Sequence, residues 1–113
     1  MQIIGTKKCP ATRAAQRFFR ERGIAFHFVD IEERGLSKGE LEAVRRGAGG
    51  RKIMDENCPA FKKKGLAYME YDEVEELLEN PRLLTTPVVR EGNRCIVGND
   101  EKAWKALAGE MKP

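Results

Sequence analysis

The stretch Gln2–Ile31, QIIGTKKCPATRAAQRFFRERGIAFHFVDI, decides the fold, because its hydrophobic period changes twice. Ile3 and Ile4 form a short apolar run that is typical of a buried strand. Apolar residues then recur at helical spacing until Gly23, which ends the predicted helix. Residues 25–31 alternate as in a second strand. The order strand, helix, strand predicts two parallel strands joined by a crossover helix.

The turn between the first strand and the helix carries a cysteine, in the sequence KKCPATR from Lys7 to Arg13. Pro10 fits the first helical position, which makes Cys9 the predicted N-cap. The free N–H groups of the first turn, the positive end of the helix dipole and the Arg13 guanidinium all favour a thiolate at Cys9. Thr12 either donates its hydroxyl to this thiolate or is only compatible with a helix start. The sequence therefore predicts a reactive cysteine that attracts anions.

The composition indicates one domain with a charged surface. The chain has 113 residues, 41% of them apolar and 35% charged, and a formal net charge of +3. This length is enough for a core without disulfides or a structural metal, so we expect a single domain over residues 1–113. No apolar run approaches the roughly 20 residues of a membrane span, and the N-terminus lacks a signal-peptide pattern. We expect a cytoplasmic protein without membrane contact and, given its small net charge, without direct nucleic-acid binding.

The three cysteines, Cys9, Cys58 and Cys95, are far apart and odd in number. In a reducing compartment this argues against a disulfide scaffold, and together with His27 they show no zinc-type spacing, so we expect no metal. His27 lies inside a predicted strand and is expected to be structural rather than catalytic. Cys95 is expected to be a small buried apolar residue. Cys58 would resolve a Cys9 disulfide only if the two Cα atoms lie within about 7 Å.

A charged helical insertion is predicted over residues of about 34–80, which contain no strand-like run. Ser37 with Glu40 and Asp72 with Glu75 form capping-box patterns, each of which predicts a helix. One or two further helical turns are expected after Cys58-Pro59. The basic clusters of the insertion are expected to be solvated faces, with contact to an acidic partner as the alternative.

A hairpin is predicted near the C-terminus. Two β-branched runs, residues 86–90 and 94–97, flank Glu91-Gly92-Asn93, which is typical of two antiparallel strands around a turn. Asn99 or Asp100 then caps a last helix, whose apolar side is expected to pack in the core.

Taken in order, several short motifs resemble the ArsC/Spx family, a thioredoxin-like group that contains glutathione-coupled arsenate reductases and Spx-type transcription regulators. They cover nearly the whole chain: Cys9-x-x-x-Arg13, Phe28-Val29-Asp30-Ile31 followed by Leu36-Ser37, residues 61–66 (FKKKGL), Thr86-Pro87-Val88-Val89, and Val97-Gly98. The resemblance implies an α/β, thioredoxin-like fold. A central mixed four-stranded sheet would be flanked by helices, with the helical insertion between the strand-helix-strand unit and the C-terminal hairpin.

The resemblance also implies a cis peptide bond before Pro87, in a loop beside the Cys9 turn. In such folds the backbone of the residue before this proline, here Thr86, pairs with a thiol-bearing substrate as an added strand would. An ordinary trans proline at the start of an edge strand is the alternative.

Family arsenate reductases use further arginines besides the one in the Cys-x-x-x-Arg motif. At or near the corresponding positions this chain has Asn57, Thr86 and Val97, so Arg13 alone remains. A site for arsenate needs several cations or donors that converge on one point. Four other arginines are candidates to substitute: Arg51, Arg82, Arg90 and Arg94.

Spx-type regulators commonly carry a Cys-x-x-Cys switch, but Thr12 replaces the second cysteine here, which excludes a local disulfide. We therefore expect a one-cysteine thiol-redox site, with Cys9 as nucleophile, Arg13 and Thr12 as its partners, and Thr86 and Pro87 as the substrate-binding loop. A mixed disulfide with glutathione or another small thiol, resolved by a second external thiol, suits this site, with no bound cofactor.

Two alternatives stay open. The first is a true arsenate reductase that depends on glutathione and glutaredoxin. The second is an Spx-like module that binds RNA polymerase without turnover, so the sequence leaves open whether the protein is an enzyme.

Overall fold

A computed structural model describes residues 1–111, apart from the side chain of residue 67. Strand β1 (Gln2–Gly5), helix α1 (Pro10–Glu21) and strand β2 (His27–Asp30) form the predicted strand-helix-strand unit. The two strands are parallel, as predicted. β2 is shorter than residues 25–31 because its pairing with β1 begins at His27, whose N–H donates to the Met1 carbonyl (2.9 Å).

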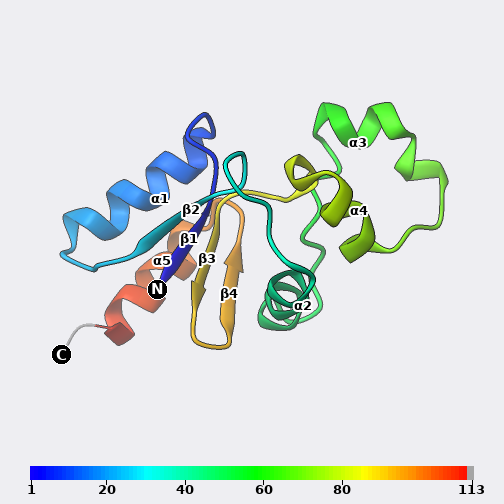
Figure 1. The fold of residues 1–113 in the computed structure, drawn as a ribbon. Coiled ribbons are helices and arrows are strands. Elements are labelled where there is room, and N and C mark those ends of the chain that lie inside the picture. The colour runs from blue at the N-terminus through cyan, green and yellow to red at the C-terminus, as the bar shows by residue number, and fades with distance from the viewer. Residues whose placement is uncertain (112–113) are drawn as a thin grey trace.

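Strands β3 (Val88–Glu91) and β4 (Arg94–Val97) form the predicted antiparallel hairpin. Gly92 in its turn has a φ of 59°, a left-handed conformation that glycine adopts without strain. β3 also pairs antiparallel with β1, which gives the order β2-β1-β3-β4. Within residues 1–111 the sheet is therefore mixed and four-stranded, as predicted, with β2 and β4 at its edges (Figure 1).

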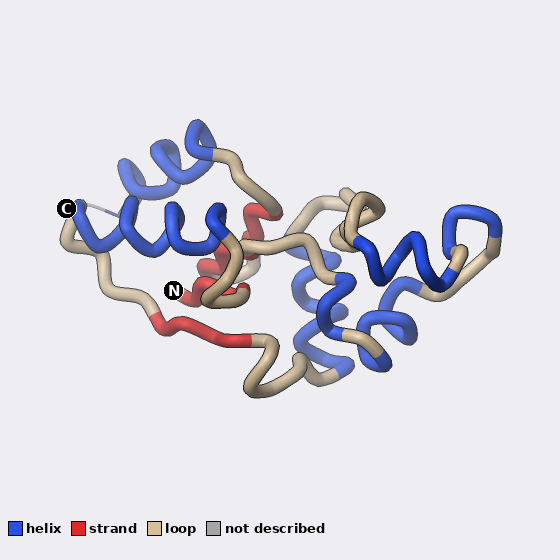
Figure 2. Tube along the Cα trace, turned by 90° about the horizontal axis from the view of Figure 1, so that it is seen from above, coloured by secondary structure: helices blue, strands red, loops and turns tan. Residues whose placement is uncertain are grey.

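Alternation along the strands gives the sheet two buried faces. Ile3 belongs to the core under α1 and α5 (Glu101–Met111), where Phe19 packs near Trp104. Ile4 belongs to the second core, which includes side chains of the insertion. Figure 2 shows α1 and α5 on the same side of the strands, whereas the helices of the insertion gather at the other end of the molecule.

The helical insertion lies between β2 and β3, as predicted. Its elements are α2 (Lys38–Gly47), α3 (Pro59–Lys64), the 3-10 helix η1 (Leu66–Tyr68), α4 (Glu73–Glu79) and the 3-10 helix η2 (Pro81–Leu83). The capping box of α2 is complete: the Ser37 hydroxyl accepts from the Glu40 N–H (3.1 Å), and the Glu40 carboxylate accepts from the Ser37 N–H (3.0 Å). At α4 one half of the box is observed, since Asp72 accepts from the Glu75 N–H (3.1 Å).

One end of the sheet brings two distant segments together. β1 ends at Gly5, beside Asp30 of β2, and β3 begins at Val88, opposite Ile4 of β1. The turn that follows β1 and the loop that precedes β3 therefore meet at this end. The fold places the Cys9 turn here, next to the loop that contains Pro87.

Candidate active site

Cys9 is the N-cap of α1, as the Cys-Pro pair predicts. Its backbone is extended (φ −78°, ψ 116°), and Pro10 lies in the first helical turn. The Cys9 N–H donates to the Thr6 carbonyl (3.3 Å), and the Cys9 carbonyl accepts from the Arg13 N–H (3.1 Å). These bonds fix the turn and hold the sulfur at the positive end of a helix of 12 residues.

The loop before β3 contacts the sulfur of Cys9. The Thr86–Pro87 peptide bond is cis, which confirms the expectation from the family resemblance. The Thr86 hydroxyl donates to Cys9 Sγ at 3.2 Å, and the Cys9 thiol donates to the Thr86 carbonyl at 3.7 Å. Residues 77 positions apart thus share one site, and the predicted position of this loop beside the Cys9 turn is confirmed.

Backbone hydrogen bonds anchor this loop on both sides. The Thr85 N–H donates to the Ile53 carbonyl at 2.7 Å, so a segment of the insertion pairs with the chain just before Thr86. On the other side, the Gly98 N–H donates to the Pro87 carbonyl at 2.8 Å. The Thr86 hydroxyl is therefore held in position by the neighbouring backbone.

The surroundings of Cys9 lower the pKa of its thiol below the usual value of 9.0. Partial burial is the largest single influence, and it acts in the opposite direction because it favours the neutral thiol. The hydroxyls of Thr12 and Thr86 and the N–H groups of Thr12 and Ala11 together outweigh it, because each donor stabilises the thiolate. The lowered pKa of Cys9 therefore arises mainly from neutral hydrogen-bond donors.

Thr12 is fully buried beneath the Cys9 turn. Its side chain packs against Gly5 of β1, where a Cβ would lie 2.7 Å from Thr12 Cγ2. Among the described residues its hydroxyl has no hydrogen-bond partner of ordinary geometry, yet it is near enough to Cys9 to lower the pKa of the thiol. A buried donor without a partner is unfavourable, and the thiolate of Cys9 offers it an acceptor.

The sequence model of the ArsC family matches residues 4–107 of the chain. The protein belongs to the ArsC family. A relative named global transcriptional regulator Spx 2, from Oceanobacillus iheyensis, is 32% identical over 99 residues, which cover 82% of this chain and 73% of that protein.

Solved structures of the same fold extend over nearly the whole chain. The YFFB (PA3664) protein superposes with a TM-score of 0.83 at 24% identity, covering 93% of this chain and 96% of that chain. The arsenate reductase from Vibrio cholerae gives a TM-score of 0.83 at 18% identity, with coverages of 95% and 98%. These likenesses confirm the thioredoxin-like fold and the predicted ArsC/Spx resemblance.

The arginine of the Cys-x-x-x-Arg motif lies on the exposed side of α1 in this ArsC-family chain. Arg13 is solvent-exposed and is not among the groups that lower the pKa of Cys9. Its role toward the thiolate or an anion stays a prediction. Among the possible substitutes, Arg90 pairs with Gln2, at the end of β1 that is farther from Cys9.

The other candidate arginines are placed on separate elements. Arg94 forms an ion pair with Glu110 of α5, and Arg51 lines a hollow of the insertion. Arg82 of η2 approaches Glu32 (Nε to Oε1, 3.9 Å), which follows β2 at the Cys9 end of the sheet. None of these arginines hydrogen-bonds to Cys9 or lowers the pKa of its thiol, although Arg82 lies at the same end of the sheet. Arsenate binding would require several such groups to converge on the sulfur.

The remaining cysteines and the histidine are placed by the structure as follows. Cys58 is the half-buried N-cap of α3 and is a free thiol, like Cys9. Cys95 is buried on β4 against Gly47 of α2, as predicted, and burial raises the pKa of its thiol. His27 is exposed at the start of β2, at the end of the sheet away from Cys9, so it takes no part in the site.

Two features of the site were not predicted. The first is Gly5, whose missing side chain admits Thr12; a glycine that ends a strand just before a functional turn is a usable signal of such close packing. The second is the hydroxyl of Thr86, for which the sequence predicted a role of the backbone only. Within residues 1–111, no group of three His, Cys, Asp or Glu side chains could hold a metal ion, and no helix is long and apolar enough to cross a membrane.

Proposed function

We propose that this ArsC-family protein performs thiol–disulfide exchange through Cys9, with glutathione or another small thiol as co-substrate. The observation that carries the proposal is the contact of Cys9 Sγ with Thr86, whose hydroxyl lies at 3.2 Å and whose carbonyl lies at 3.7 Å, at a helix N-terminus. These surroundings lower the pKa of Cys9, and the thiolate is the attacking form in such exchange.

The reaction needs one protein cysteine. The Cys9 thiolate attacks the glutathione sulfur of a mixed-disulfide substrate, a Cys9–glutathione disulfide forms, and the substrate leaves as a thiolate that takes a proton from water. The thiolate of a second glutathione then attacks the bound glutathione sulfur. Oxidised glutathione leaves, and the Cys9 thiolate is restored, so the substrate is reduced and glutathione is oxidised.

The Thr86–Pro87 loop is the proposed binding site for the backbone of the substrate. Among the described residues the Thr86 N–H has no backbone partner, so an extended peptide such as glutathione can pair with it. The hydroxyls of Thr86 and Thr12 stabilise the Cys9 thiolate before attack and again when it leaves the mixed disulfide. Arg13 is proposed to attract the anionic groups of the small thiol from its exposed position.

Mass spectrometry after incubation with oxidised glutathione tests this proposal. One glutathione should be attached to Cys9 in the wild type and in Cys58→Ser, and none in Cys9→Ser. A Cys9–Cys58 disulfide, or an adduct on Cys58 alone, would refute the one-cysteine mechanism. Reduction of a glutathionylated peptide by the wild type and by Cys58→Ser, but not by Cys9→Ser, would establish turnover.

The 32% identity to Spx 2 favours a second candidate function. In this case the chain binds RNA polymerase, as Spx-type proteins do, and changes transcription without turnover. Retention of polymerase by the immobilised Cys9→Ser variant as well as by the wild type would support it. Arsenate reduction with glutaredoxin is the remaining alternative. It is less well supported because Arg90 and Arg94 lie at the far end of the sheet and no arginine is among the groups that lower the pKa of Cys9.

A further inference from the structure

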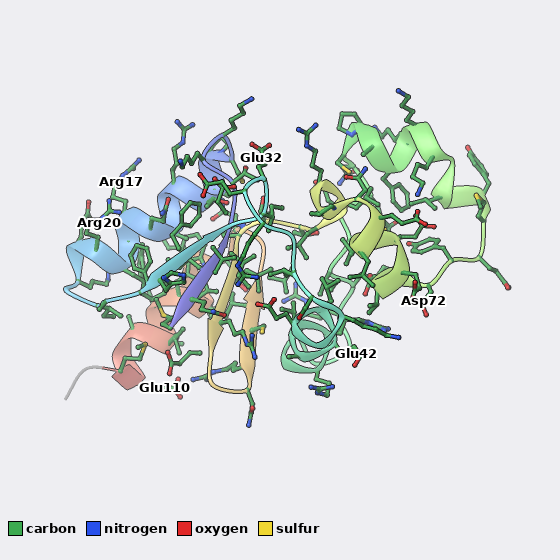
Figure 3. The ribbon with its side chains drawn as sticks, viewed as in Figure 1. Arg17, Arg20, Glu32, Glu42, Asp72 and Glu110 are labelled. Atoms are coloured by element: carbon green, nitrogen blue, oxygen red, sulfur yellow. The ribbon has the colours of Figure 1, made fainter. Side chains whose placement is uncertain are left out.

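Helix α1 presents a row of arginines to solvent. Arg13, Arg17 and Arg20 are exposed and lie at positions i, i+4 and i+7, which share one helix face. Figure 3 shows Arg17 and Arg20 extending from the outer side of α1. The ion pairs of the described residues involve other basic groups, so no described carboxylate lies within 4.0 Å of these three guanidinium groups.

Of the three arginines only Arg20, in the last turn, is placed where the helix dipole favours a cation. Like charges one turn apart repel each other, and α1 has no acidic residue in its first turn, where the helix dipole favours carboxylates. Some basic groups elsewhere on the surface are paired, for example Arg34 with Glu40 at 3.0 Å and Lys64 with Glu79 at 3.3 Å. Others, such as Lys62 and Lys63 of α3, are exposed and form no ion pair among the described residues. The row on α1 therefore offers three cations on one helix face to an external acidic partner.

An apolar hollow lies at the C-terminal end of this row. It has a volume of about 490 Å³ and is lined by Gln16 and Arg20 of α1 and by Ile24, Phe26 and Phe28. The three apolar side chains are half-buried, so part of their surface reaches solvent. The guanidinium carbon of Arg20 lies 5.8 Å from the centroid of the Phe26 ring, so the last arginine of the row is itself part of the hollow's lining.

The hollow adjoins a strand edge that is unpaired in the described sheet. β2 is an edge strand, and the N–H groups of His27 and Ile31 donate to the carbonyls of Met1 (2.9 Å) and Gly5 (3.0 Å) on the β1 side. Because successive backbone groups of a strand point to opposite sides, the N–H and carbonyl of Phe28 point away from the sheet. A peptide strand can pair with these groups.

We propose that the α1–β2 surface, comprising Arg13, Arg17, Arg20, Phe26 and Phe28, binds an extended acidic segment of a partner protein. The backbone of the segment pairs with the outer edge of β2, an apolar side chain enters the hollow, and carboxylates meet the arginines. Nucleic acid would satisfy the arginines through its phosphates, but it has no peptide backbone to pair with the strand edge. A polypeptide is therefore the occupant that fits all three features.

Fluorescence anisotropy with the full chain and a fluorescein-labelled peptide, Glu-Glu-Val-Phe-Val-Glu-Glu, tests the proposal. Arg17→Glu/Arg20→Glu should raise the Kd about tenfold, because two attractive charge contacts become repulsive. Arg17→Gln/Arg20→Gln should raise the Kd by a smaller factor, because it removes the two positive charges without adding negative ones. The matched control Lys62→Glu/Lys63→Glu makes the same change in net charge on exposed residues of α3 and should leave the Kd within about twofold of the wild type.

Amide chemical shifts during the titration locate the bound peptide. The changes should concentrate in α1 and in residues 24–30, beside the edge of β2. Equal weakening by the α3 control, equally tight binding of the peptide with lysine in place of glutamate, or a Kd above about 1 mM for the wild type would overturn the proposal. So would a single-stranded DNA oligonucleotide that binds through Arg17 and Arg20 more tightly than the peptide.

Discussion

Replacing Gly5 with alanine should disturb both the stability of the fold and the reactive turn. A Cβ at residue 5 would lie 2.7 Å from Thr12 Cγ2 and 3.0 Å from Thr12 Cβ, and it would be closer still to Thr12 Oγ1. Both residues are buried, so strand or helix has to move. Overpacking of this kind costs about 1–3 kcal/mol, partly offset by the gain of about 0.5–1 kcal/mol when alanine replaces glycine in a strand. Because the Cβ would overlap three side-chain atoms of Thr12, the cost lies at the upper end of this range, and we expect the free energy of unfolding to fall by about 2 kcal/mol.

The size of this loss should depend on residue 12. Thr12→Ala alone removes a buried methyl group, which costs about 1 kcal/mol. Its hydroxyl has no partner of ordinary geometry among the described residues, so no well-formed hydrogen bond is lost with it. In Gly5→Ala/Thr12→Ala the new methyl group occupies the space that the threonine side chain leaves. The two effects should therefore be non-additive by about 1–2 kcal/mol.

Urea unfolding, followed by the fluorescence of the buried Trp104, measures these changes. With a slope of about 1.3 kcal/mol per molar urea, a loss of 2 kcal/mol lowers the midpoint by about 1.5 M. Gly109→Ala on α5 is the control, because its added Cβ would meet open space, and it should not lower the midpoint. If the losses of Gly5→Ala and Thr12→Ala add up to the loss of the double variant within about 0.5 kcal/mol, the close approach of residues 5 and 12 is not the reason for glycine at residue 5.

Three further predictions concern protonation. Thr86→Val removes the donor 3.2 Å from Cys9 Sγ and should raise the pKa of Cys9, seen as a shift of the pH–rate profile with iodoacetamide; an unchanged profile would contradict the assigned contact. Because folding lowers the pKa of Cys9, its thiolate stabilises the folded protein. This stabilisation is fully present above the usual value of 9.0 and is lost as the pH falls through the folded pKa. The urea midpoint of the wild type should therefore increase relative to that of Cys9→Ser as the pH rises. Bonds from the Arg34 side chain and the Ser37 N–H lower the pKa of Glu40 to about 2, so Glu40→Ala should lose about 1 kcal/mol at neutral pH. That loss should fade between pH 4.5 and about 2, and a loss independent of pH would exclude the carboxylate as its source.

Local sequence patterns predicted most elements of the fold, because neighbouring residues determine them. The capping box at Ser37 starts α2 where the pattern places it, and Asp100 caps α5 by accepting from the Ala103 N–H at 3.1 Å. The turn at Gly92 joins the two hairpin strands. The mixed four-stranded sheet was expected from the family resemblance, but its order β2-β1-β3-β4 was not predicted, since the hairpin and the strand-helix-strand unit are too far apart in sequence for local patterns to pair their strands.

The partners of the sulfur could be predicted only in part. The rule that residues four apart share a helix face applies within a helix, but Cys9 is an N-cap with extended backbone, at a ψ of 116°. Arg13, although close in sequence, is accordingly not among the groups that lower the pKa of Cys9. The Thr86 hydroxyl reaches the sulfur instead, through the pairing of β1 with β3, and no local pattern contains that contact.

Stabilisation of Cys9 by neutral donors, rather than by a cluster of cations, favours one kind of chemistry. The hydroxyls of Thr12 and Thr86 and two backbone N–H groups stabilise a charge located on the sulfur itself. Disulfide exchange moves one negative charge from sulfur to sulfur, so donors around the attacking atom meet its main electrostatic requirement. A divalent oxyanion brings its own charge and several oxygens to the site, and it needs cations that face those oxygens. A site of this composition can therefore retain a reactive thiolate without the further arginines of the arsenate reductases.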